Sequence, residues 1–170
     1  MMVEENEVEI SPAGILSSIL KEIYSSLSGR NKRKFRKTLR SINAYVHIYI
    51  GGVTIHTYSD FMIKLLLKVK SEPSFNQVVE GLYPQLADTN TKVNLLIEKH
   101  KSYVSNEDRT KVEECIRDLH DSIRDISSYI EDGRYSNIEH TLFKITSKSK
   151  ELYAIGQSSL EDVSLWLDVI

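Results

Sequence analysis

YVHIYIGGVTIHTY, residues 45–58, decides between two folds for the middle of this chain. Read as a β-hairpin, it places Gly51 and Gly52 in a two-residue turn, where both positions can require a positive φ. Read as a helix, it extends the apolar spacing of residues 35–42, and Gly51 ends that helix. β-Branched residues alternate with polar or aromatic ones on both sides of the glycines. This alternation favours the hairpin, which needs further support because two strands alone are marginal in water.

The hairpin also predicts which side chains face the core. One face is aliphatic and should be covered, since burying a Val or Ile contributes roughly 1.5–3 kcal/mol; it consists of Val46, Ile48, Ile50, Val53 and Ile55. His47 and His56 are cross-strand neighbours on the other face, which we expect to look out to solvent. No Cys, Asp or Glu accompanies them, so we expect no metal site there. An exposed hairpin edge would be the place for self-association.

Apolar residues at three- and four-residue spacing predict helices along the rest of the chain. Pro73 and Pro84 are expected to break helices, and Gly156 is expected to end one. The expected helices begin at or near Ser11-Pro12, Asn31, Asp60, Ser74, Thr91, Ser105, Ser136 and Ser159. The last of these would run through Trp166 and Leu167 to Ile170. The predicted fold is therefore mainly α, a helical bundle of six to eight helices with one short β-hairpin at residues 45–58.

The clearest helix covers residues 107–132. Ser105 followed by Asp108 is typical of a capped helix start, and Gly133 is expected to end the helix as its C′ residue. The apolar positions between them alternate in spacing between four and three, as in a helix packed lengthwise along a neighbour: Val112, Ile116, Leu119, Ile123, Ile126 and Ile130. Such a seam could also hold a structural assembly together.

Size and composition indicate one domain. The 170 residues are 41% hydrophobic and 27% charged, as in ordinary globular proteins, with an acidic flexible tail at 1–9 and a single helical domain at 10–170. Cys115 is the only cysteine and is expected to be a small buried apolar residue. The longest apolar run, 61–69, contains two lysines and is too short to span a membrane. The acidic start is unlike a signal peptide, so we expect an intracellular protein, cytoplasmic or nucleoid-associated.

The charge distribution is uneven. Seven basic residues and no acidic one lie between positions 30 and 40: Arg30, Lys32, Arg33, Lys34, Arg36, Lys37 and Arg40. The net charge is −2, so the remainder of the chain carries −9 by subtraction. A helix with this density of cations can bind a nucleic-acid backbone, or can dock an acidic protein surface. Tyr45, Tyr49 and Tyr58 are the nearby aromatic residues that could stack on bases.

GRYSNIEH, residues 133–140, contains Arg134 and His140 with five residues between them. This spacing resembles that of HEPN ribonucleases, helical bundles in which four to six residues separate an arginine from a histidine and the motif is paired across a dimer. The resemblance implies a ribonuclease that uses Arg134 and His140. Tyr135 departs from the family, which commonly has a small polar residue after the arginine. An arginine near a helix C-terminus is also favoured by the helix dipole alone.

ELYAIGQSSLEDVSLWLDV, residues 151–169, resembles a passage in the helical C-terminal domain of archaeal and eukaryotic primase large subunits. The matching positions are Ile155, Gly156, Ser159 and Glu161. That domain holds an iron–sulfur cluster with four cysteines, which this chain lacks, so the resemblance implies a cluster-free accessory protein. A glycine that ends one helix and a serine that caps the next would account for the same residues without a common ancestor.

The sequence therefore predicts a non-catalytic accessory or adaptor subunit. We expect the basic residues at 30–40 to bind the phosphate backbone of a nucleic acid, or an acidic protein partner. We expect the protein to act in a larger complex, with no cofactor and no membrane contact. The ribonuclease, the primase-like accessory protein and the structural assembly protein are the competing hypotheses.

Overall fold

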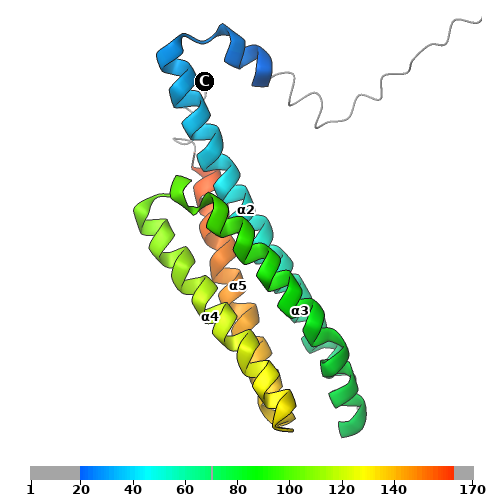
Figure 1. Ribbon diagram of the computed structural model, residues 1–170. Coiled ribbons are helices and arrows are strands. Elements are labelled where there is room, and N and C mark those ends of the chain that lie inside the picture. The colour runs from blue at the N-terminus through cyan, green and yellow to red at the C-terminus, as the bar shows by residue number, and fades with distance from the viewer. Residues whose placement is uncertain (1–19, 70, 163–170) are drawn as a thin grey trace, which may run out of the picture.

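The computed structural model describes residues 20–69 and 71–162. Four long helices account for most of them: α2 (Gly29–Leu66), α3 (Glu72–His100), α4 (Asn106–Glu131) and α5 (Ile138–Glu161). They lie side by side and run alternately up and down, as Figure 1 shows. Two short 3-10 turns, η1 (Lys101–Tyr103) and η2 (Tyr135–Asn137), precede α4 and α5, and residues 20–26 are helical as well. The prediction of a mainly helical bundle is confirmed, whereas the six to eight helices and the β-hairpin are wrong.

Residues 45–58 lie in the middle of α2, a helix of 38 residues. Seven of its buried positions are spaced alternately by three and four residues, which keeps them on one face of a helix: Tyr45, Ile48, Gly52, Ile55, Ser59, Met62 and Leu66. Two of these positions are Gly and Ser, so the seam is not recognisable as an apolar stripe. Packing along this seam outweighs the β propensity of the alternating Val, Ile and Thr residues.

The glycines at the centre of α2 allow neighbouring helices to approach closely. A Cβ added to Gly52 would lie 2.5 Å from the backbone nitrogen of Tyr153 on α5. From the other side, a Cβ on Gly156 of α5 would lie 2.6 Å from the backbone nitrogen of Tyr49. A Cβ added to Gly51 would lie 2.6 Å from a side-chain methyl of Val93 on α3. The glycine pair therefore serves helix contacts on two sides of α2 and forms no turn.

Helical geometry corrects the predicted orientation of the side chains at 45–58. Ile48 and Ile55 are buried as expected, but Ile50 is 55% exposed because it lies on the outer face of α2. His47 and His56, expected in solvent, are half-buried against neighbouring helices. Because residues 45–58 are helical, they offer no strand edge through which another chain could associate.

Helix α3 continues through Pro84, where the sequence predicted a break. Proline costs roughly 3 kcal/mol inside a helix. Val79, Leu86 and Ile97 are almost fully buried on one face of α3, and their burial offsets that cost. Pro73 lies in the first turn of α3, where a missing N–H removes no helical hydrogen bond. The two helices expected from Ser74 and Thr91 are therefore one.

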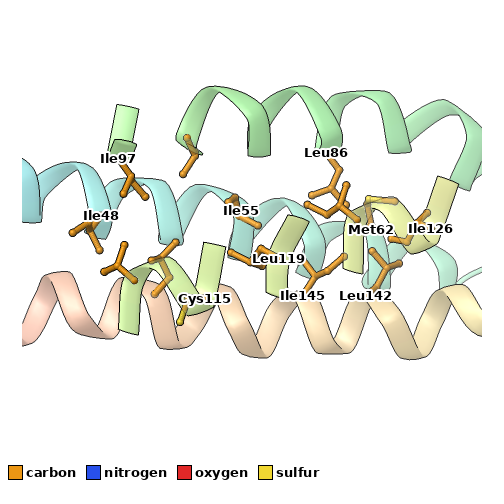
Figure 2. Packing of buried hydrophobic residues seen from close by; sticks show 14 of the residues in the cluster. Ile48, Ile55, Met62, Leu86, Ile97, Cys115, Leu119, Ile126, Leu142 and Ile145 are labelled. Atoms are coloured by element: carbon orange, nitrogen blue, oxygen red, sulfur yellow. The ribbon is translucent and has the colours of Figure 1, made fainter. Parts of the chain in front are cut away.

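The predictions for α4 are confirmed. Ser105 is the N-cap, and its Oγ accepts a hydrogen bond of 3.1 Å from the N–H of Asp108. Gly133 has a φ of 69° just after the helix, as a C′ glycine should. Side chains from the seam, such as Leu119 and Ile126, meet residues of the other helices in one core (Figure 2). Four residues of the seam are buried within the chain, whereas Ile116 and Ile130 are half-buried. The hypothesis of a structural assembly protein stays untested.

Helix α5 differs from the prediction at both ends. Its N-cap is Asn137, without a side-chain cap, and not Ser136. Gly156 and Ser159 lie inside α5, so neither ends nor starts a helix. The helix stop and cap inferred for the primase-like passage are therefore absent, and Gly156 is small because α2 packs against it. The expected tail at 1–9, the helix start at Ser11-Pro12 and the helix end at Trp166–Ile170 lie outside the described residues.

Within the described residues, none of the helices has the length and apolar character needed to cross a membrane.

Candidate functional site

The basic residues at 30–40 form the first three turns of α2. Phe35 and Thr38 are buried on one side of this segment, so the cations occupy the other faces. Six of them are exposed and Lys32 is half-buried. The first turns of α2 extend beyond the ends of α3, α4 and α5 (Figure 1), which leaves them open to a partner. We refer to the seven basic residues as the basic end of α2.

Three cations of the basic end have no carboxylate partner among the described residues. Arg30, Arg33 and Lys37 make no ion pair and no ring contact with any residue that the structure describes. By contrast, several lysines elsewhere pair with acids of their own or a neighbouring helix, as Lys64 does with Asp60. The basic end therefore presents a positive potential that an anion can use.

Two tyrosines contact the basic end through cation–π interactions. Lys32 Nζ and Arg36 Cζ lie 5.2 Å and 5.0 Å from the ring centroid of Tyr24. Arg40 Cζ lies 5.4 Å from the ring centroid of Tyr103, which belongs to η1. Such contacts hold a cation near an aromatic ring without removing its charge.

The fold adds two further cations to the basic end. The α4-side cleft, about 620 Å³, lies between α2 and the start of α4 and is lined by Lys37, Tyr103 and Arg109 among others. The α3-side cleft, about 370 Å³, is lined by Arg40, Lys99 and Tyr103 with Leu39, Asn43 and His100. Tyr103 lines both clefts. Lys99, Tyr103 and Arg109 are distant in sequence from 30–40, and no sequence pattern pointed to them.

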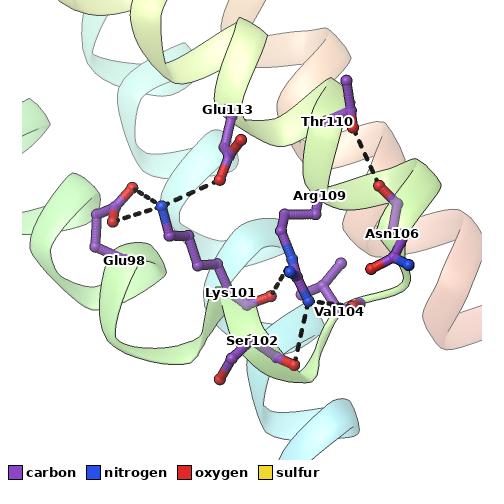
Figure 3. Close-up of polar contacts among 8 residues, drawn as sticks. All are labelled: Glu98, Lys101, Ser102, Val104, Asn106, Arg109, Thr110 and Glu113. Atoms are coloured by element: carbon purple, nitrogen blue, oxygen red, sulfur yellow. Dashed lines mark hydrogen bonds and ion pairs between the residues drawn. The ribbon is translucent and has the colours of Figure 1, made fainter.

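Polar contacts fix the turn that carries Tyr103, as Figure 3 shows. Lys101 Nζ lies 2.8 Å from a carboxylate oxygen of Glu98 and 3.1 Å from one of Glu113, and these hydrogen bonds raise the pKa of Lys101. Arg109 Nε donates to the carbonyl oxygen of Lys101 at 3.2 Å. Hydrogen bonds thus connect the α3–α4 turn to both helices. They fix the position of the turn, which lines both clefts.

Tyr45 attaches the same turn to α2. Its hydroxyl donates to a carboxylate oxygen of Asp108 at 2.7 Å and accepts from the N–H of Ser105 at 3.2 Å. Ser105 Oγ also donates to that carboxylate, at 2.8 Å. The carboxylate of Asp108 is therefore occupied by donors within the protein, and Tyr45 is 5% exposed.

The tyrosines that the sequence suggested for stacking are placed elsewhere. Tyr45 is buried, and Tyr49 packs edge-on against Tyr153 with ring centroids 6.3 Å apart. The Tyr58 hydroxyl donates to Leu82 and Gln85, and burial raises the pKa of Tyr58. Burial excludes Tyr45 from stacking on a base, while Tyr49 and Tyr58 contact α5 and α3; Tyr24 and Tyr103 are the tyrosines whose rings lie beside cations.

The histidines of α2 hold helices together. The His47 ring stacks on that of His100 with centroids 4.6 Å apart and planes 20° apart. His56 Nδ1 lies 3.1 Å from the carbonyl oxygen of Thr146 on α5. Among the described residues, no group of three or more His, Cys, Asp or Glu side chains could hold a metal ion.

We expect the protein to lose stability as the pH falls below about 6.5. Burial, followed by the charges of His100 and Lys99, lowers the pKa of His47 below 6.5. The neutral form is thus favoured in the folded state, so stability is complete above the unfolded pKa and is lost as pH falls through it. The melting temperature, measured between about pH 7.5 and 5, should drop less in His47→Asn than in the natural protein. An equal drop in both would contradict this assignment.

Cys115 is 5% exposed, which confirms the expected buried residue, and burial raises its pKa to about 11. It is therefore a poor nucleophile at neutral pH.

Arg134 and His140, the ribonuclease candidates, lie at the opposite end of the bundle from the basic end, at the α4–α5 connection (Figure 1). The Arg134 guanidinium forms an ion pair with Asp132 and lies 5.1 Å from the ring centroid of Tyr129. His140 is exposed in the first turn of α5. The arginine is thus engaged by its own loop, and the ribonuclease hypothesis stays untested.

Comparison of the chain with models of protein families, with curated proteins and with solved structures finds no match.

Proposed function

We propose that this protein is a non-catalytic accessory subunit that binds nucleic acid through the basic end of α2. The observation that carries the proposal is an exposed group of cations, projecting past the bundle and lacking described carboxylate partners at Arg30, Arg33 and Lys37. Lys99 and Arg109 extend the positive surface around Tyr103. Phosphates neutralised by Lys and Arg supply most of the affinity of such surfaces.

Nucleic acid fits this surface better than an acidic protein does. Protein interfaces usually have an apolar core inside a polar rim, whereas nucleic-acid interfaces are more polar and strongly positive. The most exposed large apolar side chains lie away from the basic end: Ile50 in the middle of α2, Leu67 just after α2, and Leu95 in α3. The basic end offers charge and two tyrosine rings, with no comparable apolar centre among its described residues.

Binding should weaken steeply with salt. If about five side chains each neutralise one phosphate, affinity should fall roughly 100-fold for single strands and 500-fold for duplexes between about 50 and 200 mM salt. Fluorescence anisotropy with labelled single-stranded DNA, single-stranded RNA and duplex DNA measures this directly. Failure to bind any of the three at the lower salt concentration would overturn the proposal and favour an acidic protein partner.

We expect bound RNA to remain intact. Labelled RNA incubated with the protein, with or without a divalent metal ion, should run at its full length on a denaturing gel. Cleavage that disappears in both Arg134→Ala and His140→Ala would replace the non-catalytic proposal by the ribonuclease. Both residues are exposed, so the two substitutions should leave the fold unchanged.

A further inference from the structure

The strongest remaining feature is the position of Tyr103 between two cationic clefts. Tyr103 belongs to η1, the three-residue turn between α3 and α4, and its ring is half-buried. The α4-side cleft is lined by Tyr103, Lys37 and Arg109, whose guanidinium donates to backbone carbonyls of the same turn and keeps its charge. The α3-side cleft is lined by Tyr103, Lys99 and Arg40, and Arg40 Cζ lies 5.4 Å from the ring centroid. Tyr103 therefore lines two clefts that each contain at least two cations.

This arrangement matches the needs of a single strand. A strand that crosses an aromatic ring needs a cation for the phosphate before the ring and another for the phosphate after it, while its base stacks on the ring face. The cleft volumes, about 620 and 370 Å³, fall within the range of about 300–1,000 Å³ found for ligand pockets. In a duplex the bases are already stacked on each other, so a ring contributes little.

Arg40 shows that the ring face of Tyr103 accepts a planar cation. Its guanidinium carbon lies 5.4 Å from the ring centroid. This contact holds the guanidinium beside the ring without removing its charge, so Arg40 can bind a phosphate next to a base that stacks on Tyr103. Tyr24 is less suited, because Lys32, Arg36 and the ring of Phe35 already surround it.

We propose that the two clefts around Tyr103 form a binding subsite for single-stranded nucleic acid, in which Tyr103 stacks one base and the flanking cations hold its phosphates. This inference rests on the proposed function and adds to it the class of substrate. Tyr103 would then distinguish single strands from duplexes, whereas the basic end would supply affinity for both.

The experiment compares three probes and two variants. The probes are a single strand of about 12 nucleotides, a strand of equal length in which the bases are missing, and a duplex. Tyr103→Phe keeps the ring, and Tyr103→Leu keeps an apolar side chain without it. Anisotropy should show Tyr103→Leu binding the single strand about 5- to 100-fold more weakly, with the duplex changed less than about twofold. Tyr103→Phe should bind all three probes as the natural protein does.

The base-free strand tests the inference without any substitution. The natural protein should bind it about as weakly as Tyr103→Leu binds the normal strand. Equal affinity of the natural protein for the strands with and without bases would overturn the inference, and so would equal weakening of all probes in Tyr103→Leu. Either result leaves the proposed function standing, because that function fails only if no nucleic acid binds.

Discussion

Reversing Arg30, Arg33 and Lys37 to glutamate should abolish nucleic-acid binding and leave the fold intact. Each lost phosphate contact weakens binding, and each new carboxylate repels the backbone, so we expect a loss of about 100-fold or more at about 100 mM salt. The salt dependence of any residual binding should be shallower by about two for a single strand. Anisotropy titrations over a range of salt concentrations measure both quantities.

The three positions were chosen because they support nothing else in the described structure. They make no ion pair and no ring contact there, whereas Arg36 and Arg40 each contact a tyrosine ring. Circular dichroism and the melting temperature should therefore stay close to those of the natural protein.

A matched control changes the net charge by the same amount elsewhere. Lys68, Lys144 and Lys150 are exposed and lie outside the basic end, so reversing them to glutamate should weaken binding far less. Equal weakening in both triple variants would show that only the total charge matters, and would contradict the proposed site.

The second large effect concerns the contact between α2 and α5. Gly52→Ala should destabilise the protein by about 1–3 kcal/mol, since its Cβ would lie 2.5–2.9 Å from Tyr153 atoms that include the backbone of α5. A shift of about 2–4 °C per kcal/mol is typical of this size, so the melting temperature should fall by several degrees. Gly156→Ala should behave alike, because its Cβ would meet the backbone of α2.

Gly81→Ala is the matched control. Gly81 lies inside α3, is exposed, and has nothing within 4 Å of an added Cβ. Alanine should there stabilise the helix by about 0.5–1 kcal/mol through its higher helix propensity. The double variant of Gly52 and Gly156 should lose less than the sum of the single losses, since one displacement of α5 relieves both contacts. A stabilising Gly52→Ala would contradict the close approach of α2 and α5.

Local chemistry alone determined several features of this protein. The hydroxyl of Ser105 and the N–H of Asp108 are three residues apart, so the start of α4 could be read from the chain. Gly133 marked the end of α4, because glycine is the residue type that most readily adopts a positive φ after a helix. The basic end of α2 was predictable for the same reason, because a run of cations belongs to one short segment whatever the fold.

Tertiary structure decided what residues 45–58 become. A strand and a helix were both compatible with the local pattern, because Gly52 and Ser59 hold seam positions without an apolar side chain. Their role depends on α5, whose Tyr153 and Gly156 come about 100 residues later. Pro84 is a similar case, since burial along α3 offsets a local preference to end the helix.

In the candidate site, too, the sequence predicted one part and the tertiary structure decided the other. The charge of the site was predictable from residues 30–40, but its aromatic ring was not, because Tyr45 is buried while Tyr49 and Tyr58 contact α5 and α3. Tyr103 and Arg109 reach the basic end only because the α3–α4 turn folds back against α2 and is tied there by Tyr45 and Asp108. Spacing along a chain reports neighbours within one helix, whereas contacts between helices depend on how their faces pack.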